Sequence, residues 1–244
     1  MEQQIWTVRS IKVLFIGLAV GVASSVLSYA PASLGIAFEP PADEPAPRNS
    51  AGGASRGDLC PQTLATADQP RPVALLPQSA YGKTLEAHPT LLFYMPESNA
   101  DGAIFTLKDE EKNLLYFSEI SLGGSESVVS LTLPDDAPVL EVGQRYQWFV
   151  VFRCEGQLYP DSYYIDGWIQ RTTEADLQRE IVSSNALSKA TALGLSGIWY
   201  DSLSTLAALR LEQPQSSELL DHWHELLEDV GLESLALAPI MVLD

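Results

Sequence analysis

Short runs of β-branched and aromatic residues recur between residues 73 and 171, and clusters of turn-forming residues separate them. The seven runs are VALLP (73–77), PTLLFYMP (89–96), AIFTLKD (103–109), NLLYFSEI (113–120), SVVSLTLP (127–134), RYQWFVVFRC (145–154) and YYIDGWIQR (163–171). No stretch with helical periodicity lies between them. Seven short strands separated in this way predict an antiparallel β-sandwich.

Alternation within the run 145–154 assigns its side chains to two faces, because successive strand residues point to opposite sides. We expect the inward set to be Tyr146, Trp148, Val150, Phe152 and Cys154. If this strand pairs with the run 163–171, an outer apolar patch results, made of Phe149, Val151, Tyr164 and Trp168. Such a patch is normally covered. Either the C-terminal helices of the chain pack on it, or its rings form a platform for a sugar or a partner.

Beyond residue 172 the apolar residues recur at helical spacing. One stripe would contain Leu195, Trp199, Leu203 and Leu206, and a second Leu219, Trp223, Leu226 and Val230. Ser216 or Ser217 suits the start of the second helix, and Gly231 suits its end. Tyr200 and Asp201 fall off the first stripe. We therefore expect Trp199 to pack, and Tyr200 and Asp201 to be exposed members of an interaction surface with Phe149, Tyr164 and Trp168.

The N-terminus has the layout of a secretory signal. Basic residues in 1–12 precede the apolar stretch VLFIGLAVGVA (13–23), and small residues follow it. We predict a signal peptide over 1–32, with an uncleaved anchor as the alternative, since 20 residues barely span a bilayer. Residues 33–58 are rich in Pro, Ala, Gly and Ser, and this composition predicts a disordered linker.

Charge disfavours some classes of partner, and the two cysteines bear on the compartment. The chain has 14 Lys and Arg against 32 Asp and Glu, a net charge of −18, which disfavours binding to nucleic acid or anionic lipid. Its two cysteines, Cys60 and Cys154, predict a disulfide in an oxidising compartment; two free buried thiols are the alternative. We expect an exported protein of the periplasm, cell envelope or medium, without a membrane span once the signal peptide is removed.

Recognisable catalytic and metal-binding motifs are missing from the sequence. His222 and His224 are two residues apart, which on a helix points their rings in different directions, and His88 stands alone before a proline. There is no nucleophile elbow, P-loop or dinucleotide fingerprint. We therefore predict no catalytic residues, no metal site, no cofactor and no enzyme activity, although paired carboxylates are recognisable only in three dimensions.

Two local motifs resemble known repeat and sandwich families. The stretch LEVGQRY (140–146) has the spacing of a tyrosine corner at Tyr146, and resembles immunoglobulin-like and fibronectin type III domains. The stretch GIWYDSLSTLAALRLEQP (197–214) resembles the second helix of a tetratricopeptide repeat, although Ala186 replaces the tryptophan expected in the first helix. The implied architecture is α+β, with a sandwich over 59–172 and a helical hairpin over 173–244 that docks on the sandwich or on a partner.

From Cys60 onward the chain resembles a cyanobacterial family of exported proteins whose domain has no assigned function. The segments that carry the resemblance are RGDLCPQ, PTLLFYMP, LEVGQRYQWFVVFRC, GWIQR, GIWYDSLSTLAALR and WHELLEDVGLESLA. The resemblance implies an envelope location and brings no catalytic residues.

Three functions remain open at this level. The first is a non-catalytic adaptor or scaffold that binds another envelope or secreted protein. The second is a glycan-binding module that uses Tyr164 and Trp168. The third is a hydrolase, which would need a cavity with two close carboxylates and a raised pKa.

Overall fold

The computed structural model describes residues 36–41, 59–60, 70–182 and 184–243. These residues all belong to one unit. The predicted signal peptide and most of the predicted linker lie outside the described residues.

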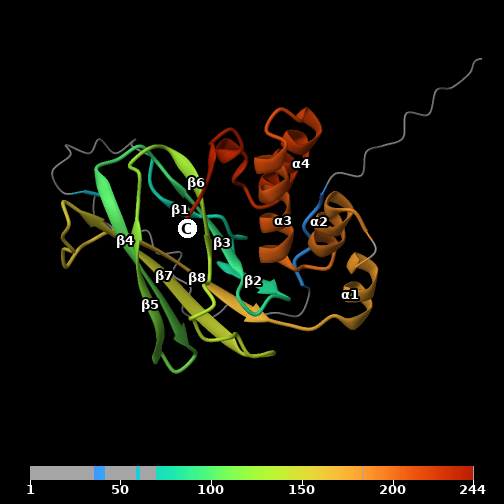
Figure 1. The fold of residues 1–244 in the computed structure, drawn as a ribbon, viewed down its shortest axis with the longest axis horizontal. Helices are drawn as coiled ribbons and strands as arrows, with labels where there is room; N and C mark the ends of the chain where they lie inside the picture. Colours follow the sequence, from blue (N-terminus) through green and yellow to red (C-terminus); the bar gives the residue numbers. More distant parts are fainter. Residues whose placement is uncertain (1–35, 42–58, 61–69, 183, 244) are drawn as a thin grey trace, which may run out of the picture. The chain divides into compact units, whose positions relative to one another are not determined.

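Two sheets form the β part of this unit (Figure 1). The first contains, in spatial order, β1 (Val73–Ala74), β3 (Thr90–Met95), β6 (Ser127–Thr132) and β9 (Ile240–Val242). The second contains β2 (Tyr81–Thr84), β8 (Tyr164–Arg171), β7 (Arg145–Cys154), β4 (Ala100–Asp109) and β5 (Leu114–Ser121). All seven predicted runs contain a strand, although the first is only two residues long.

The expectation of a purely antiparallel sandwich is wrong at two edges. Strands β2 and β9 were not predicted, and each adds to its sheet in parallel, β2 beside β8 and β9 beside β6. Both strands are short, and YGKT in β2 lacks apolar alternation, so neither carries a strand signal of its own. The fold is therefore α+β, with two mostly antiparallel sheets followed by helices.

The inward face of β7 is as predicted. Its residues alternate between buried and half-buried along the whole strand, with Trp148, Val150 and Phe152 almost fully buried. The predicted corner at Tyr146 is also confirmed, because the Glu141 amide N–H donates a 2.9 Å hydrogen bond to the Tyr146 hydroxyl. The bond fixes the chain at the entry to β7.

The predicted disulfide between Cys60 and Cys154 is present. It joins the end of β7 to a residue 94 positions earlier, with 5.8 Å between the two Cα atoms. Both cysteines are buried. The disulfide therefore ties the chain that enters the domain to the far end of its central strand.

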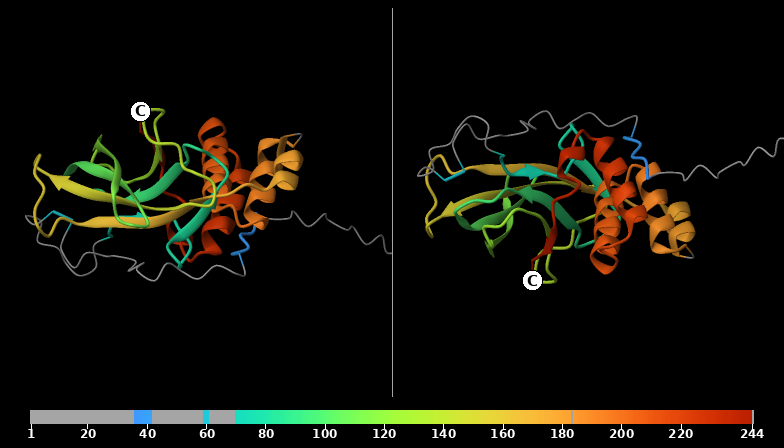
Figure 2. Two further views of the ribbon diagram at one scale, coloured as in Figure 1. Left: turned by 90° about the horizontal axis from the view of Figure 1, so that it is seen from below. Right: turned by 90° about the horizontal axis from the view of Figure 1, so that it is seen from above.

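Four helices follow the sandwich, and Figure 2 shows them together at one end of the sheets. They are α1 (Ala175–Val182), α2 (Ala186–Leu195), α3 (Trp199–Glu212) and α4 (Ser217–Glu228), followed by the 3₁₀ turn η1 (Glu233–Leu235). Ser216 caps α4 as predicted, since its hydroxyl accepts from the Leu219 amide at 3.3 Å. Gly231, with φ of 77°, lies in the turn after α4.

The first predicted stripe does not belong to one helix. Leu195 ends α2 and is exposed, whereas Trp199 begins α3 after a turn at Gly197, whose φ of 72° favours glycine. Trp199, Leu203 and Leu206 are buried as expected.

Helix α3 packs against the sheets beside β2 and β3 (Figure 1) and contributes side chains to the same hydrophobic cluster as the strands. The Trp199 indole donates to the Leu75 carbonyl at 2.9 Å, and the Tyr200 hydroxyl donates to the Trp168 carbonyl at 3.0 Å. Residues from both sheets and from α2, α3 and α4 form one continuous hydrophobic cluster. The sheets and helices therefore share one interior.

Candidate functional site

The outer face of β7 and β8 carries only part of the predicted patch. The two strands pair as expected, and Phe149, Val151 and Tyr164 are half-buried, with the rings of Phe149 and Tyr164 6.2 Å apart. Trp168, however, is buried, because the unpredicted strand β2 pairs beside it. The prediction of an exposed aromatic platform at Tyr164 and Trp168 is therefore wrong, because the Trp168 ring is buried. The helical cover does not extend over the rest of the patch, since α3 packs on β2 and β3.

The expectation that Tyr200 and Asp201 are exposed is also wrong. Both are buried, with 2% and 6% of their surface accessible. Helix α3 lies between α2 and α4 and also contacts β2 and β3, so several of its faces are buried at once. Neighbours cover such a helix from several directions, so a single apolar stripe cannot identify all of its buried residues.

Asp201 joins α3 to the end of β2. Its Oδ2 accepts from the Leu85 amide at 2.9 Å, and its Oδ1 accepts from the Thr84 hydroxyl at 3.2 Å. Burial raises the pKa of Asp201 from 3.8 to about 6, and the two hydrogen bonds and Lys189 offset only part of that increase. Because both carboxylate oxygens already accept hydrogen bonds, the geometry favours a structural role over acid–base catalysis.

A polar cavity of about 370 Å³ opens beside Asp201, between α3 and the strands β3 and β6. Its lining combines carboxylates, hydroxyls, an imidazole and an ammonium, from Glu86, His88, Thr90, Ser130, Thr132, Lys189, Asp201, Ser204 and Thr205, with apolar side chains such as Leu211 and Val242. Thr90 and Thr132 share a 2.8 Å hydrogen bond on the strand side. Such a mixture of donors and acceptors suits a small hydroxylated ligand.

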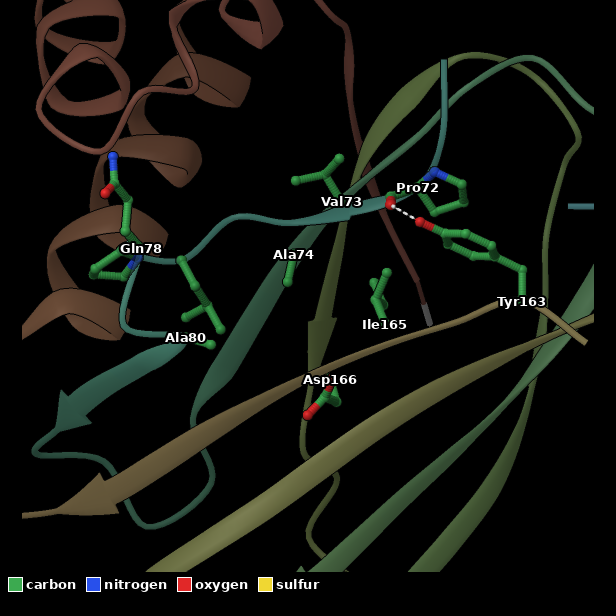
Figure 3. Close-up of a pocket in the computed structure, with 10 residues that line it drawn as sticks. Pro72, Val73, Ala74, Gln78, Ala80, Tyr163, Ile165 and Asp166 are labelled. Atoms are coloured by element: carbon green, nitrogen blue, oxygen red, sulfur yellow. Dashed lines mark hydrogen bonds between the residues drawn. The ribbon is translucent and has the colours of Figure 1, made fainter. Parts of the chain in front are cut away.

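An apolar pocket of about 260 Å³ lies between β1 and the start of β8 (Figure 3). Val73 and Ala74 line it from β1, and Tyr163 and Ile165 line it from the β8 side. The Tyr163 hydroxyl donates to the Pro72 carbonyl at 3.3 Å, and burial raises the pKa of this tyrosine. The buried carboxylate of Asp166 also lines this pocket, and its Oδ2 accepts a 2.8 Å hydrogen bond from the Gln147 side-chain amide.

Within the described ranges, no three His, Cys, Asp or Glu side chains are grouped closely enough to hold a metal ion. In the same part of the chain, none of the helices has both the length and the apolar character needed to cross a bilayer.

The site with the most complete set of contacts binds residues 36–41 of the chain itself. The prediction of a disordered linker is wrong for this segment, because Ile36 and Phe38 are buried, with 1% and 8% of their surface accessible. The Phe38 ring packs edge-on against Trp199, with 4.8 Å between centroids. Large apolar side chains in an otherwise small-residue, proline-rich stretch were the available signal that this segment packs.

Two hydrogen bonds hold the backbone of this segment. The Phe38 amide donates to Asp229 Oδ2 at 2.7 Å, and the Glu39 amide donates to the Gly194 carbonyl at 3.2 Å. We call the surface formed by Gly194, Gly197, Trp199 and Asp229 the segment site. It recognises an extended chain by backbone contacts together with two buried side chains.

Glycines make this close approach possible. A Cβ at Gly194 would lie 2.7 Å from the Ala37 carbonyl oxygen, and one at Gly197 would lie 3.0 Å from the Glu39 carbonyl oxygen. Any larger residue at Gly194 would therefore push residues 36–41 away. Neither glycine nor Asp229 was predicted as a site residue from the sequence.

The structure thus separates the predicted interaction residues. Phe149 and Tyr164 lie together on the outer sheet face, whereas Tyr200 and Asp201 lie inside, where Tyr200 contacts the buried strand residue Trp168.

Comparisons with known proteins identify the family but no activity. The chain has no significant match among curated protein sequences. Among solved structures it is similar to a multi-domain immunophilin from Arabidopsis thaliana, at 6% identity and a TM-score of 0.20, over 61% of this chain and 91% of that chain. That likeness is too low to carry an argument. The profile of the family described as Domain of Unknown Function (DUF928) matches residues 51–240, and the chain therefore belongs to the DUF928 family.

Proposed function

We propose that this protein is an exported, non-catalytic adaptor of the cell envelope, which binds an extended segment of a protein at the segment site. The observation that carries the proposal is the packing of residues 36–41, in which Ile36 and Phe38 are buried and the Phe38 and Glu39 amides are hydrogen-bonded. Backbone hydrogen bonds supply affinity in such recognition, and pockets for alternate side chains supply specificity.

The architecture supports a recognition role. The strands β1, β3 and β6 share one sheet, and β5, β4, β7 and β8 share the other, which supports an immunoglobulin-like or fibronectin type III-like sandwich. In the helices, Ser202 donates to the Ala190 carbonyl at 2.8 Å, and both residues are fully buried. This close α2–α3 contact through small residues supports a tetratricopeptide-like hairpin, a unit that needs a partner surface to cover it.

Export is supported by two independent features. The buried Cys60–Cys154 disulfide suits an oxidising compartment. The basic and apolar N-terminal residues have the layout of a signal peptide. The resemblance to cyanobacterial exported proteins adds the envelope as the location.

The test of the proposed function is binding in trans. We would weaken the chain's own segment with Phe38→Ala in the full-length protein and add a labelled peptide of residues 34–43. Fluorescence anisotropy should report saturable binding, because the site keeps Gly194 and Asp229, and a peptide with Ile36 and Phe38 replaced by serine should not bind. Absence of binding by the unaltered peptide would contradict the proposal.

A partner would then be sought in intact cells. A photo-crosslinker at Ser196, which is exposed between Gly194 and Gly197 of the segment site, should yield a recurrent adduct with another envelope protein. The same crosslinker at Glu110, in the exposed β4–β5 turn, is the matched control. Adducts that form equally at both positions would argue against the segment site as the binding surface.

The polar cavity beside Asp201 favours a second candidate, glycan binding. Its hydroxyls and charged groups offer both donors and acceptors to a sugar, whereas the Trp168 ring is buried. Retention on a panel of immobilised envelope glycans should fall at least tenfold in Lys189→Met, since Lys189 lines the cavity. Retention unaffected by that change, or abolished equally by Lys112→Met in the distant β4–β5 turn, would exclude the cavity.

A further inference from the structure

We infer that the segment site also accepts residues 36–41 of a second copy, so that two copies of this protein exchange their N-terminal segments. The inference rests on the proposed function, because it assumes that the site binds its segment in trans. The inference names a second copy of this protein as one partner that the proposed function leaves unidentified.

The occupant is chosen by fit. Residues 36–41 fit the segment site closely: the Ile36 and Phe38 side chains are buried, Phe38 packs on Trp199, and its amide donates to Asp229. A second copy presents the same residues to the same site. Exchange would therefore replace every contact of the segment with an identical one. The exchanged and unexchanged forms differ only in whether the bound segment belongs to the same chain or to the other chain.

The connection is long enough. Residues 36–41 are joined to the disulfide-anchored Cys60 through residues 42–59. A chain of this length spans at most about 60 Å when fully extended. That distance reaches a neighbouring molecule, whereas a turn of a few residues would confine the segment to its own domain.

Reciprocal exchange closes the assembly. When each copy donates one segment and accepts the other, a symmetric dimer forms with no site left unfilled. The intramolecular arrangement competes at an effective concentration on the order of 1 mM. We therefore expect monomers in dilute solution and a growing dimer fraction as the protein approaches that concentration. Because each chain carries a net charge of −18, added salt should favour the dimer by screening the repulsion.

Complementation between two full-length variants tests the exchange. The first, Ile36→Ser/Phe38→Ser, loses the segment and keeps the site. The second, Gly194→Val, keeps the segment and blocks the site, because a side chain there meets the Ala37 carbonyl oxygen. Each alone should be monomeric in light scattering. Mixed in equal amounts, they should form a heterodimer of twice the monomer mass, since the free segment of one fills the empty site of the other.

Controls and alternatives separate the possible failures. Glu39→Ser and Ser188→Val, at exposed positions of the segment and of α2, should not complement each other in this way. If the mixture stays monomeric while the peptide of residues 34–43 binds the first variant, exchange is wrong and the proposed function stands. If the peptide fails to bind as well, both are wrong.

A measurement without variants covers the case in which either variant fails to fold. Isotope-labelled and unlabelled wild-type protein would be mixed near 1 mM, and native mass spectrometry would look for dimers of intermediate mass. Mixed dimers that dissociate on addition of excess peptide 34–43 are the expected result. Absence of mixed dimers overturns the inference.

Discussion

The indole Nε1 of Trp148, on β7, donates a 2.8 Å hydrogen bond to the hydroxyl of Tyr200, on α3. The same hydroxyl donates to the Trp168 carbonyl on β8 at 3.0 Å. One tyrosine thus satisfies a buried donor and a buried acceptor of the sheet. The helical region is bound to the sandwich by specific polar contacts as well as by apolar packing.

Replacing Tyr200 with phenylalanine should destabilise the protein. The change leaves the Trp148 indole N–H unpaired in the core and removes a donor to the Trp168 carbonyl, at a cost of about 1–3 kcal/mol for each unsatisfied group. Urea unfolding monitored by tryptophan fluorescence would give the free energy of unfolding. Tyr164→Phe, on the half-buried outer face, is the matched control and should change it little. Equal effects of the two substitutions would contradict the role of Tyr200.

Gly167→Ala should also destabilise, for a steric reason. Gly167 lies opposite Trp148 in the β7–β8 pair, and a Cβ there would be 2.3 Å from Leu76 Cδ1 and 2.7 Å from the Trp148 ring. Overpacking of this kind costs about 1–3 kcal/mol. A Cβ at Gly123 meets nothing within 4 Å, so Gly123→Ala is the control, measured by thermal unfolding. An unchanged melting temperature for Gly167→Ala would show that the core accommodates the methyl group.

Asp201 should make stability depend on pH. Its pKa is about 6 in the folded chain, above its usual value, so the folded state holds the proton more tightly than the unfolded state. This contribution is complete below about pH 4 and is lost as the pH rises through 6. A difference of about 2 in pKa corresponds to roughly 3 kcal/mol.

The comparison that isolates this effect is with Asp201→Asn. Asparagine removes the titration and keeps one acceptor for the Leu85 amide or the Thr84 hydroxyl. The unfolding free energy of the wild type, relative to that of the variant, should fall between pH 4 and 6, because background carboxylates contribute equally to both. A relative stability that stays constant or rises over this interval would contradict the raised pKa.

Loss of the disulfide should produce a large effect on stability. Cys60→Ala/Cys154→Ala removes a crosslink that closes 94 positions, and chain entropy predicts a loss of about 4–5 kcal/mol. Guanidinium unfolding would measure the difference, and reduced wild type should match the variant. Alkylation followed by mass measurement is the check on pairing, since two reactive thiols in the unreduced protein would show that no disulfide forms.

Most strands of the sandwich were predictable because they are runs of β-branched and aromatic residues between turn-forming residues, and in β7 alternation also assigned the two faces. In β7 every second residue is buried from Tyr146 to Cys154, as the pattern required. Strands β2 and β9 were not predictable, since they consist of four and three residues and form only through parallel pairing with distant partners. Their existence depends on tertiary contacts that local sequence does not encode.

The candidate site was less predictable than the fold. The apolar stripe predicts the burial of Trp199 correctly but misses the burial of Tyr200 and Asp201, because several elements pack around α3. The segment site depends on the absence of side chains at Gly194 and Gly197, and on an aspartate 191 residues away from the amide that it accepts. Neither the missing side chain of a glycine nor a contact between residues far apart in the chain produces a pattern in the local sequence.

The parallel pairing of β9 with β6 has a consequence for how the protein is made. The first sheet is incomplete until residues 240–242 have been synthesised. The Phe38 amide can donate its hydrogen bond to Asp229 only after residue 229 has been synthesised. A ribosome-bound chain that has not reached these residues therefore lacks its final strand and the anchor for its first segment. The complete first sheet and the packing of residues 36–41 can form only at the end of synthesis, long after Cys60 and Cys154 have both been made.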